Sequence, residues 1–206
     1  MQQIYVHGLG QTPDSWDNVL SYLDADKHSI CPDLSELIKG QDTTYQNLYS
    51  AFSEICNLAD DTLALCGLSL GGVLALNYVI EHPKKVEKLV LISAQYKMPK
   101  KLLKLQNTIF HLMPKFMFNQ TGFNKHDFLR LCNTMIELDF SQSLQKVSSP
   151  TMVVCGEKDR ANEAASTKLA ELLNNATLQI ISNTGHEVNI EAPKDLADIL
   201  NNFYKS

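Results

Sequence analysis

The sequence predicts an α/β fold with a mainly parallel sheet that is covered by helices on both faces. Two observations carry this prediction: short apolar, β-branched runs alternate with longer helical patterns, and several of the short runs are almost continuously apolar. Continuous apolar runs are typical of strands buried on both faces, and this alternation is typical of right-handed crossovers in a parallel sheet. The expected strands are Gln3–His7, His28–Cys31, Thr62–Cys66, Lys88–Ile92, Thr151–Cys155 and Thr177–Ile181.

Five helices are expected between and after these strands. The last one shows the clearest pattern, because Leu196, Leu200 and Phe203 recur at helical spacing and would form one buried face. Pro193 suits the first turn of this helix. The expected helices are Ser15–Leu23, Thr44–Leu58, Leu70–Glu81, Asn162–Leu173 and Lys194–Tyr204.

Composition limits the class of protein. The 206 residues are 44% hydrophobic and 20% charged, which is typical of a globular protein that buries its own core. The net charge of -5 argues against nucleic-acid binding, which usually needs a basic surface. The five cysteines include no C-x-x-C pair, so neither a zinc site nor a redox motif is predicted. Without a signal-peptide pattern or a run of about 18 apolar residues, a cytoplasmic protein with no membrane span is expected.

The segment from Lys97 to Ser141 interrupts the alternation. It has no convincing strand, only helical patterns that are cut by Pro99, Pro114 and Gly122. It contains seven basic and three acidic residues, and so has a net charge of +4. We expect a single domain of residues 1–206 in which residues 97–141 form a small helical cap. The alternative is a helical hairpin whose lysines only face water.

The sequence Gly67-Leu68-Ser69-Leu70-Gly71-Gly72 directly follows a predicted strand and precedes a predicted helix. In this setting a G-x-S-x-G motif forms a sharp strand-to-helix turn that exposes its serine at the head of the helix. The helix N-terminus would place its positive dipole end and free N–H groups beside the hydroxyl. Ser69 is therefore the candidate nucleophile.

A serine hydroxyl needs a base that takes its proton. Among six histidines, His186 is favoured because it follows the last predicted strand, at the same carboxyl edge of the sheet as Ser69. Asp159 follows the fifth predicted strand and could orient that histidine, although a turn or helix N-cap role is the alternative. Glu157 is a rival acid, but it lies within the turn itself. The chain order serine, aspartate, histidine is that of hydrolases with such a turn.

The sequence His7-Gly8-Leu9-Gly10 follows the first predicted strand. Its glycines allow the backbone to turn so that an N–H group points at the site. We expect the amides of Leu9 and Leu70 to form an oxyanion hole, in which one donor is typically worth about 2.7–4 kcal/mol of transition-state stabilisation. We expect His7 to hold this loop in place and not to act as a second base.

Together these motifs resemble the α/β-hydrolase family, from the first strand to the last helix. The resemblance implies hydrolysis of a small-molecule carboxylic ester or thioester through an acyl-enzyme, with neither a cofactor nor a metal. A serine at the turn excludes the family's dehalogenases and epoxide hydrolases, which carry aspartate there, and its dienelactone hydrolases, which carry cysteine. The implied roles are Ser69 as nucleophile, His186 as general base, Asp159 as orienting acid, and Leu9 and Leu70 as oxyanion donors.

Two other functions stay open. Members of this family use the same residues for C–C bond cleavage, hydroxynitrile cleavage or the elimination step of menaquinone synthesis, usually with polar cap groups for a charged substrate. Arg130 could bind such a substrate, whereas Phe116 and Met117 could line an acyl pocket or only pack the cap. The other function is that of a ligand sensor that keeps the three catalytic residues and turns over very slowly.

Overall fold

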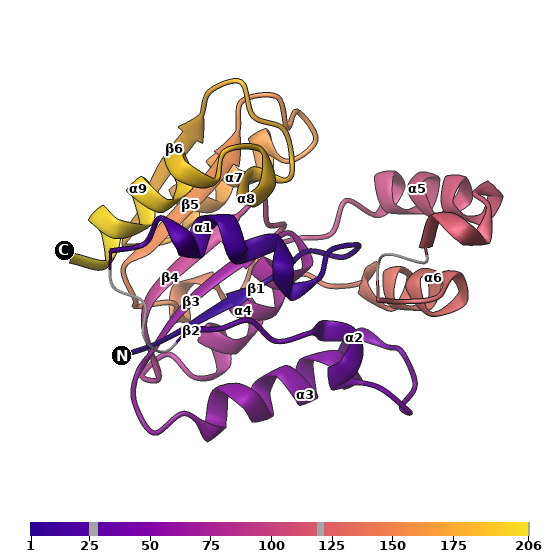
Figure 1. Ribbon diagram of the computed structural model, residues 1–206, viewed down its shortest axis with the longest axis horizontal. Coiled ribbons are helices and arrows are strands. Elements are labelled where there is room, and N and C mark those ends of the chain that lie inside the picture. The colour runs from indigo at the N-terminus through magenta and orange to yellow at the C-terminus, as the bar shows by residue number, and fades with distance from the viewer. Residues whose placement is uncertain (25–28, 119–121, 206) are drawn as a thin grey trace.

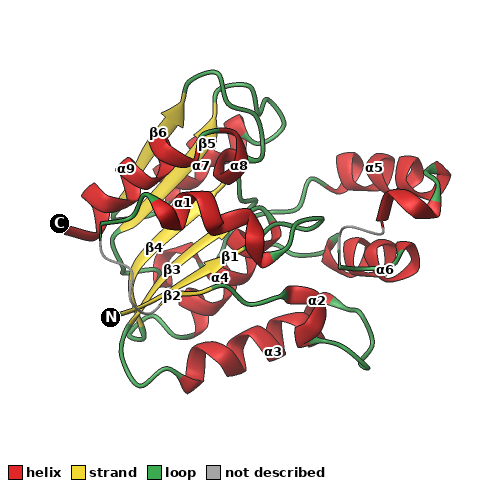
Figure 2. Cartoon of the chain, viewed as in Figure 1, coloured by secondary structure: helices red, strands yellow, loops and turns green. Residues whose placement is uncertain are grey.

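The computed structural model describes residues 1–24, 29–118 and 122–205, without the side chains of residues 101, 102, 104–107, 116 and 117. It contains one six-stranded sheet in the order β2-β1-β3-β4-β5-β6, and every neighbouring pair of strands is parallel (Figures 1 and 2). The strands are β1 (Gln2–Val6), β2 (Ser29–Ile30), β3 (Leu63–Leu68), β4 (Val86–Ile92), β5 (Thr151–Gly156) and β6 (Ala176–Ile181).

Helices connect these strands along the whole chain. Within the described ranges, no helix combines the length and the hydrophobicity that a bilayer crossing requires. The 3-10 helices of the described residues are η1 (Pro13–Trp16), η2 (Lys115–Phe118) and η3 (Leu144–Lys146). The α-helices are α1 (Asp17–Ser21), α2 (Leu34–Leu37), α3 (Tyr45–Leu58), α4 (Leu70–Glu81), α5 (Lys100–Leu112), α6 (Lys125–Met135), α7 (Glu163–Leu172), α8 (Val188–Glu191) and α9 (Pro193–Lys205).

The sheet separates two hydrophobic cores, because alternate side chains of a strand point to opposite faces. In β1, Ile4 and Val6 belong to the core beneath α3, α4 and α7, whereas Tyr5 belongs to the core beneath α1, α8 and α9. All six residues of β3 are buried. Burial on both faces explains why the central strands read as continuous apolar runs in the sequence.

The predicted fold class is confirmed, and all six strands are present with ends shifted by at most two residues wherever the chain is described. His28, the predicted start of the second strand, lies outside the described residues. The predicted helix Ser15–Leu23 is wrong in its extent, because a 3-10 helix precedes a shorter α1. The four-residue helices α2 and α8 were not predicted, since one turn is too short to show a hydrophobic period.

The helical insertion, residues 97–141, lies between β4 and β5 and extends away from the sheet (Figure 1). Lys97 and Asp139 close its base through an antiparallel bridge and a 2.8 Å ion pair. Helix α6 is fixed to the core, since the backbone N–H of Tyr45 at the start of α3 donates to the Thr134 hydroxyl at 2.9 Å.

Three phenylalanines give the insertion a small apolar centre of its own. The rings of Phe110, Phe118 and Phe128 contact one another edge-on, with centroids 5.1–6.3 Å apart. These edge-to-face contacts join α5, η2 and α6, and such pairs stabilise a fold beyond their burial alone.

Candidate active site

Ser69 occupies a strained turn between β3 and α4. Its backbone has φ 53° and ψ -114°, a region that residues other than glycine rarely adopt. The turn needs glycine on both sides, because a Cβ atom on Gly67 would lie 2.3 Å from the backbone of Gly71, and one on Gly71 would lie 2.2 Å from the carbonyl oxygen of Val6. Close packing of β1, β3 and α4 therefore holds the serine at the carboxyl edge of the sheet.

His186 and Asp159 form a hydrogen-bonded pair beside this turn. The distance between His186 Nδ1 and Asp159 Oδ2 is 2.7 Å. An ionised carboxylate can only accept, so Nδ1 carries the proton and Nε2 is left able to accept one. Asp159 is almost fully buried, whereas the His186 side chain is 41% exposed. The carboxylate of the pair is thus shielded from solvent, whereas the imidazole is accessible to it.

The surroundings of Asp159 favour its charged form. Burial by itself raises the pKa of this carboxyl group, but the hydrogen bonds from His186 and Asn162, with the nearby Ser93 hydroxyl, outweigh burial and hold the pKa below its ordinary value. The rival acid Glu157 is engaged elsewhere, because it accepts the backbone N–H of Asn183 at 2.7 Å.

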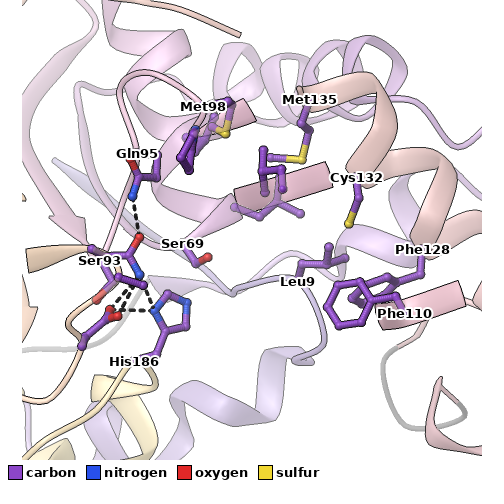
Figure 3. A pocket seen from close by; sticks show the side chains of 17 residues that line it. Leu9, Ser69, Ser93, Gln95, Met98, Phe110, Phe128, Cys132, Met135 and His186 are labelled. Carbon is purple, nitrogen blue, oxygen red and sulfur yellow. Dashed lines mark hydrogen bonds and ion pairs between the residues drawn. The ribbon is translucent and has the colours of Figure 1, made fainter. Parts of the chain in front are cut away.

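Two amide side chains that the sequence analysis did not single out connect to this pair. Asn162 Nδ2 lies 2.8 Å from Asp159 Oδ1 and 3.0 Å from Oδ2. Gln95 Nε2 in turn donates to Asn162 Oδ1 at 2.7 Å (Figure 3). In the sequence, Asn162 reads only as a residue at the start of a helix, so no signal marks this contact.

The predicted oxyanion donors lie at the same site. Leu9 and Leu70 both line the cavity that contains Ser69, and Leu70 is the first residue of α4. Neither backbone N–H donates a hydrogen bond to any other described part of the chain. Both amides are therefore available to an oxygen atom of a ligand.

His7 holds the loop after β1. Its Nε2 accepts the backbone N–H of Leu34 at 3.2 Å, so its Nδ1 carries the proton and donates to the carbonyl of Gly8 at 2.9 Å. Burial lowers the pKa of His7, which keeps the ring neutral. Both nitrogens are used within the chain, which matches the structural role expected for this histidine.

A buried amide pair connects this loop to the segment that carries His186. Gln11 Oε1 accepts the backbone N–H of Gly8 at 3.2 Å, and Gln11 Nε2 donates to Asn189 Oδ1 at 3.2 Å and to Glu187 Oε1 at 3.1 Å. Gln11 and Asn189 are 6% and 0% exposed. The loop of Leu9 and the turn of His186 are thus held in a fixed relation.

One cavity of about 420 Å³ brings these groups together (Figure 3). Ser69 lies between a polar side, with His186 and Gln95, and an apolar side, with Phe110 and Phe128. The core and the helical insertion both contribute to the wall. The lining residues are Leu9, Ser69, Leu70, Val73, Ser93, Gln95, Met98, Pro99, Leu103, Phe110, Phe128, Cys132, Met135, Asp159, Ala161, Asn162 and His186.

Of the three substrate-binding candidates of the insertion, Arg130 is described and is not among the lining residues of this cavity. Arg130 instead pairs with Asp42 through an Nη1–Oδ1 contact of 2.9 Å. The side chains of Phe116 and Met117 lie outside the described residues. In the portion of the chain that is described, no three His, Cys, Asp or Glu side chains are grouped so as to hold a metal ion.

The parallel sheet, the strained serine turn and the histidine–aspartate pair define the α/β class of hydrolase folds. The chain belongs to the alpha/beta hydrolase family, whose sequence model matches residues 4–199.

Comparison with individual proteins agrees with this assignment. Monoacylglycerol lipase abhd6-A from Xenopus laevis is 20% identical over 98% of this chain and 75% of its own length. The pimeloyl-[acyl-carrier protein] methyl ester esterase from Aromatoleum aromaticum is 35% identical over 43% of this chain and 35% of its own length. The crystal structure of a bacterial membrane phospholipase A superposes with a TM-score of 0.83 at 19% identity, covering 99% of this chain and 78% of that one.

Proposed function

We propose that this chain is a serine hydrolase that cleaves carboxylic esters or thioesters. One observation carries the proposal: the strained Ser69 lines the same cavity as His186, whose Nδ1 lies 2.7 Å from Asp159. The names of two relatives, a monoacylglycerol lipase and a methyl ester esterase, support an ester as the bond that is cleaved.

The proposed reaction proceeds through an acyl-enzyme. Ser69 Oγ attacks the ester carbonyl while His186 Nε2 takes the hydroxyl proton, and the carbonyl π electrons move to oxygen. Collapse of this intermediate breaks the ester bond, and His186 returns the proton to the leaving alcohol or thiol. Water then repeats the sequence on the acyl-enzyme, which releases the acid and restores Ser69.

The amides of Leu9 and Leu70 stabilise the oxyanion in both steps. They have no acceptor in the described chain and come from two different elements, the loop after β1 and the head of α4. Donors fixed in advance by a folded backbone need no reorganisation when the charge develops, which makes them effective.

The cavity favours a neutral acyl group. No lysine or arginine occurs among its described lining residues, and apolar side chains form the wall opposite His186. Four of the five described Lys and Arg side chains of the insertion are engaged elsewhere, and the fifth, Lys115, is exposed and is not among the described lining residues of the cavity. Lys97 pairs with Asp139, Lys100 with Glu137, Arg130 with Asp42, and Lys125 donates to the carbonyls of His111 and Met113.

Residues 97–141 act as a cap within a single domain of residues 1–206. The insertion supplies Phe110, Phe128, Cys132 and Met135 to the cavity wall, so its helices select the acyl chain. Each methylene that enters this wall contributes up to about 0.8 kcal/mol, or roughly a fourfold gain in kcat/KM.

A fluorophosphonate probe and a panel of p-nitrophenyl esters, from acetate to palmitate, test the proposal. We expect rapid labelling and turnover of the wild type. Ser69→Ala loses both, with an unchanged melting temperature, whereas the control Ser50→Ala on the exposed side of α3 keeps both. Labelling without turnover of any ester would favour one of the two alternative functions, a ligand sensor with very slow turnover or a non-hydrolytic enzyme that uses the same three residues. Wild-type activity in Ser69→Ala would refute the assignment.

A further inference from the structure

Asn162 makes a bidentate contact with the carboxylate of Asp159. Its Nδ2 lies 2.8 Å from Oδ1 and 3.0 Å from Oδ2, and Oδ2 is also the atom that accepts from His186 Nδ1. The side chain lies at the N-terminus of α7, three residues after Asp159, and lines the cavity. The aspartate is therefore held from two directions, by its catalytic partner and by Asn162.

The orientation of the Asn162 amide follows from the chemistry of its neighbours. An ionised carboxylate has no proton to give, so the amide must turn its NH2 group toward Asp159. Its oxygen then faces away, where Gln95 Nε2 donates to it at 2.7 Å. A flipped amide would lose the donor to the aspartate and face the Gln95 donor with another donor. The Gln95 donor thus supports the orientation that the carboxylate imposes on Asn162.

The short distance between the Asn162 and His186 side chains does not reflect a hydrogen bond between them. Asn162 Nδ2 lies 3.2 Å from His186 Nδ1, but both atoms carry protons when Nδ1 donates to Asp159. This contact is not a hydrogen bond between the two nitrogens. Both donors converge on Asp159 Oδ2, and the carboxylate cannot rotate without losing at least one of them.

We propose that Asn162, supported by Gln95, is a positioning residue that keeps the carboxylate of Asp159 aligned with His186 Nδ1. This inference rests on the proposed serine hydrolase reaction and adds two side chains to it. Gln95 lies between β4 and α5, in the segment that leads into the helical insertion. The hydrogen bonds from Gln95 to Asn162 and from Asn162 to Asp159 therefore connect this segment to the carboxylate of the site. A positioning role acts on the chemical step and leaves the apolar wall of the cavity unchanged.

The kinetic test uses Asn162→Leu, which keeps the approximate shape without a donor, and Asn162→Asp, which replaces the donor by an acceptor. We expect each to lower kcat for p-nitrophenyl butyrate about 10–100-fold, the loss typical when a residue that orients a metal ligand is replaced, with KM within twofold of the wild type. We expect Gln95→Leu to lower kcat by a smaller factor, again with little change in KM. Asn47→Leu on α3, which removes an amide donor to the Asp42 carbonyl, is the matched control and keeps kcat.

A second measurement does not depend on turnover. The proton between His186 Nδ1 and Asp159 Oδ2 is expected to give a downfield proton NMR resonance in the wild type and in Asn47→Leu. We expect this resonance to move or disappear in both Asn162 variants, with melting temperatures near that of the wild type. An unchanged resonance, an unchanged kcat or a change confined to KM would overturn the positioning role. Absence of probe labelling in the wild type would count against the hydrolase proposal, and the resonance would still test Asn162.

Discussion

His186 Nδ1 donates to Asp159 Oδ2 over 2.7 Å, across 27 residues of chain. Asp159→Asn replaces the acceptor by an amide that no longer selects the Nδ1–H tautomer, so His186 loses the free Nε2 that the proposed reaction needs. We expect kcat/KM for a short ester to fall about 10⁴-fold. Glu157→Gln is the matched control, because its carboxylate binds the Asn183 amide, and it should keep activity within threefold. Equal losses in both variants would contradict the assignment of Asp159.

The same carboxylate makes stability depend on pH. Because its pKa in the folded protein is below the ordinary 3.8, Asp159 stabilises the fold above that value. This contribution is lost as the pH falls from about 4 through the lower folded pKa. Urea unfolding of the wild type and Asp159→Asn between pH 6 and 2.5 should show the contribution shrinking in that window. The exposed Asp198→Asn on α9 controls for the change in net charge, and an identical pH dependence of all three proteins would refute the expectation.

The serine turn depends on the contact between α4 and β1. In Gly71→Ala, a methyl group would be built 2.2 Å from the carbonyl oxygen of Val6, so α4 must move. We expect a loss of about 3 kcal/mol of unfolding free energy, at the upper end of overpacking costs, together with loss of probe labelling. Gly40→Ala is the control, since its φ is +80° but no atom lies within 4 Å. It should cost only about 1 kcal/mol and leave labelling intact. A Gly71→Ala protein as stable as Gly40→Ala would show that the turn tolerates a side chain.

The apolar side of the cavity should determine acyl-chain length. Cys132→Phe places a ring in the wall opposite His186, which shortens the space for a chain. We expect kcat/KM for p-nitrophenyl octanoate to fall at least about tenfold relative to acetate, the effect of excluding two or three methylenes. Leu112→Phe introduces the same aromatic ring at a position that is 83% exposed and should leave the ratio unchanged. A parallel loss for both esters in Cys132→Phe would argue for general misfolding of the insertion.

Arg130 provides a test of substrate charge. Its guanidinium pairs with Asp42 and is absent from the described cavity wall. Arg130→Ala should therefore change kcat/KM less than twofold, and Asp42→Ala should behave in the same way. Exposed ion pairs of this kind contribute about 0–1 kcal/mol, so little change in melting temperature is expected. A large rise in KM for Arg130→Ala alone would instead support the hypothesis that the substrate is anionic and binds Arg130.

Much of the architecture could be predicted from the sequence because its signals are local. Each strand is a short apolar run, and Ser69, Asp159 and His186 each follow the end of a strand. Since parallel strands end at one edge of the sheet, these three residues were expected at one site, and the structure places all three in one cavity wall. Their catalytic roles remain our proposal.

The contacts among amide side chains could not be predicted in this way. Gln95, Asn162 and Gln11 are common polar residues without a motif, and their partners are set by the packing of loops that are distant in the sequence. For Arg130, by contrast, the sequence offered a signal that the structure does not bear out as a cavity contact. Its charge suggested a ligand, but the direction of its side chain depends on how α6 lies against the loop before α3.

The three rings of Phe110, Phe118 and Phe128 have a consequence for how this protein can change over evolutionary time. Two of them line the cavity, and all three form the apolar centre of the insertion. A mutation of Phe110 or Phe128 that reshapes the wall therefore also weakens the packing that holds α5, η2 and α6 together. New specificity is more accessible at Cys132 and Met135, which line the same wall outside this aromatic cluster.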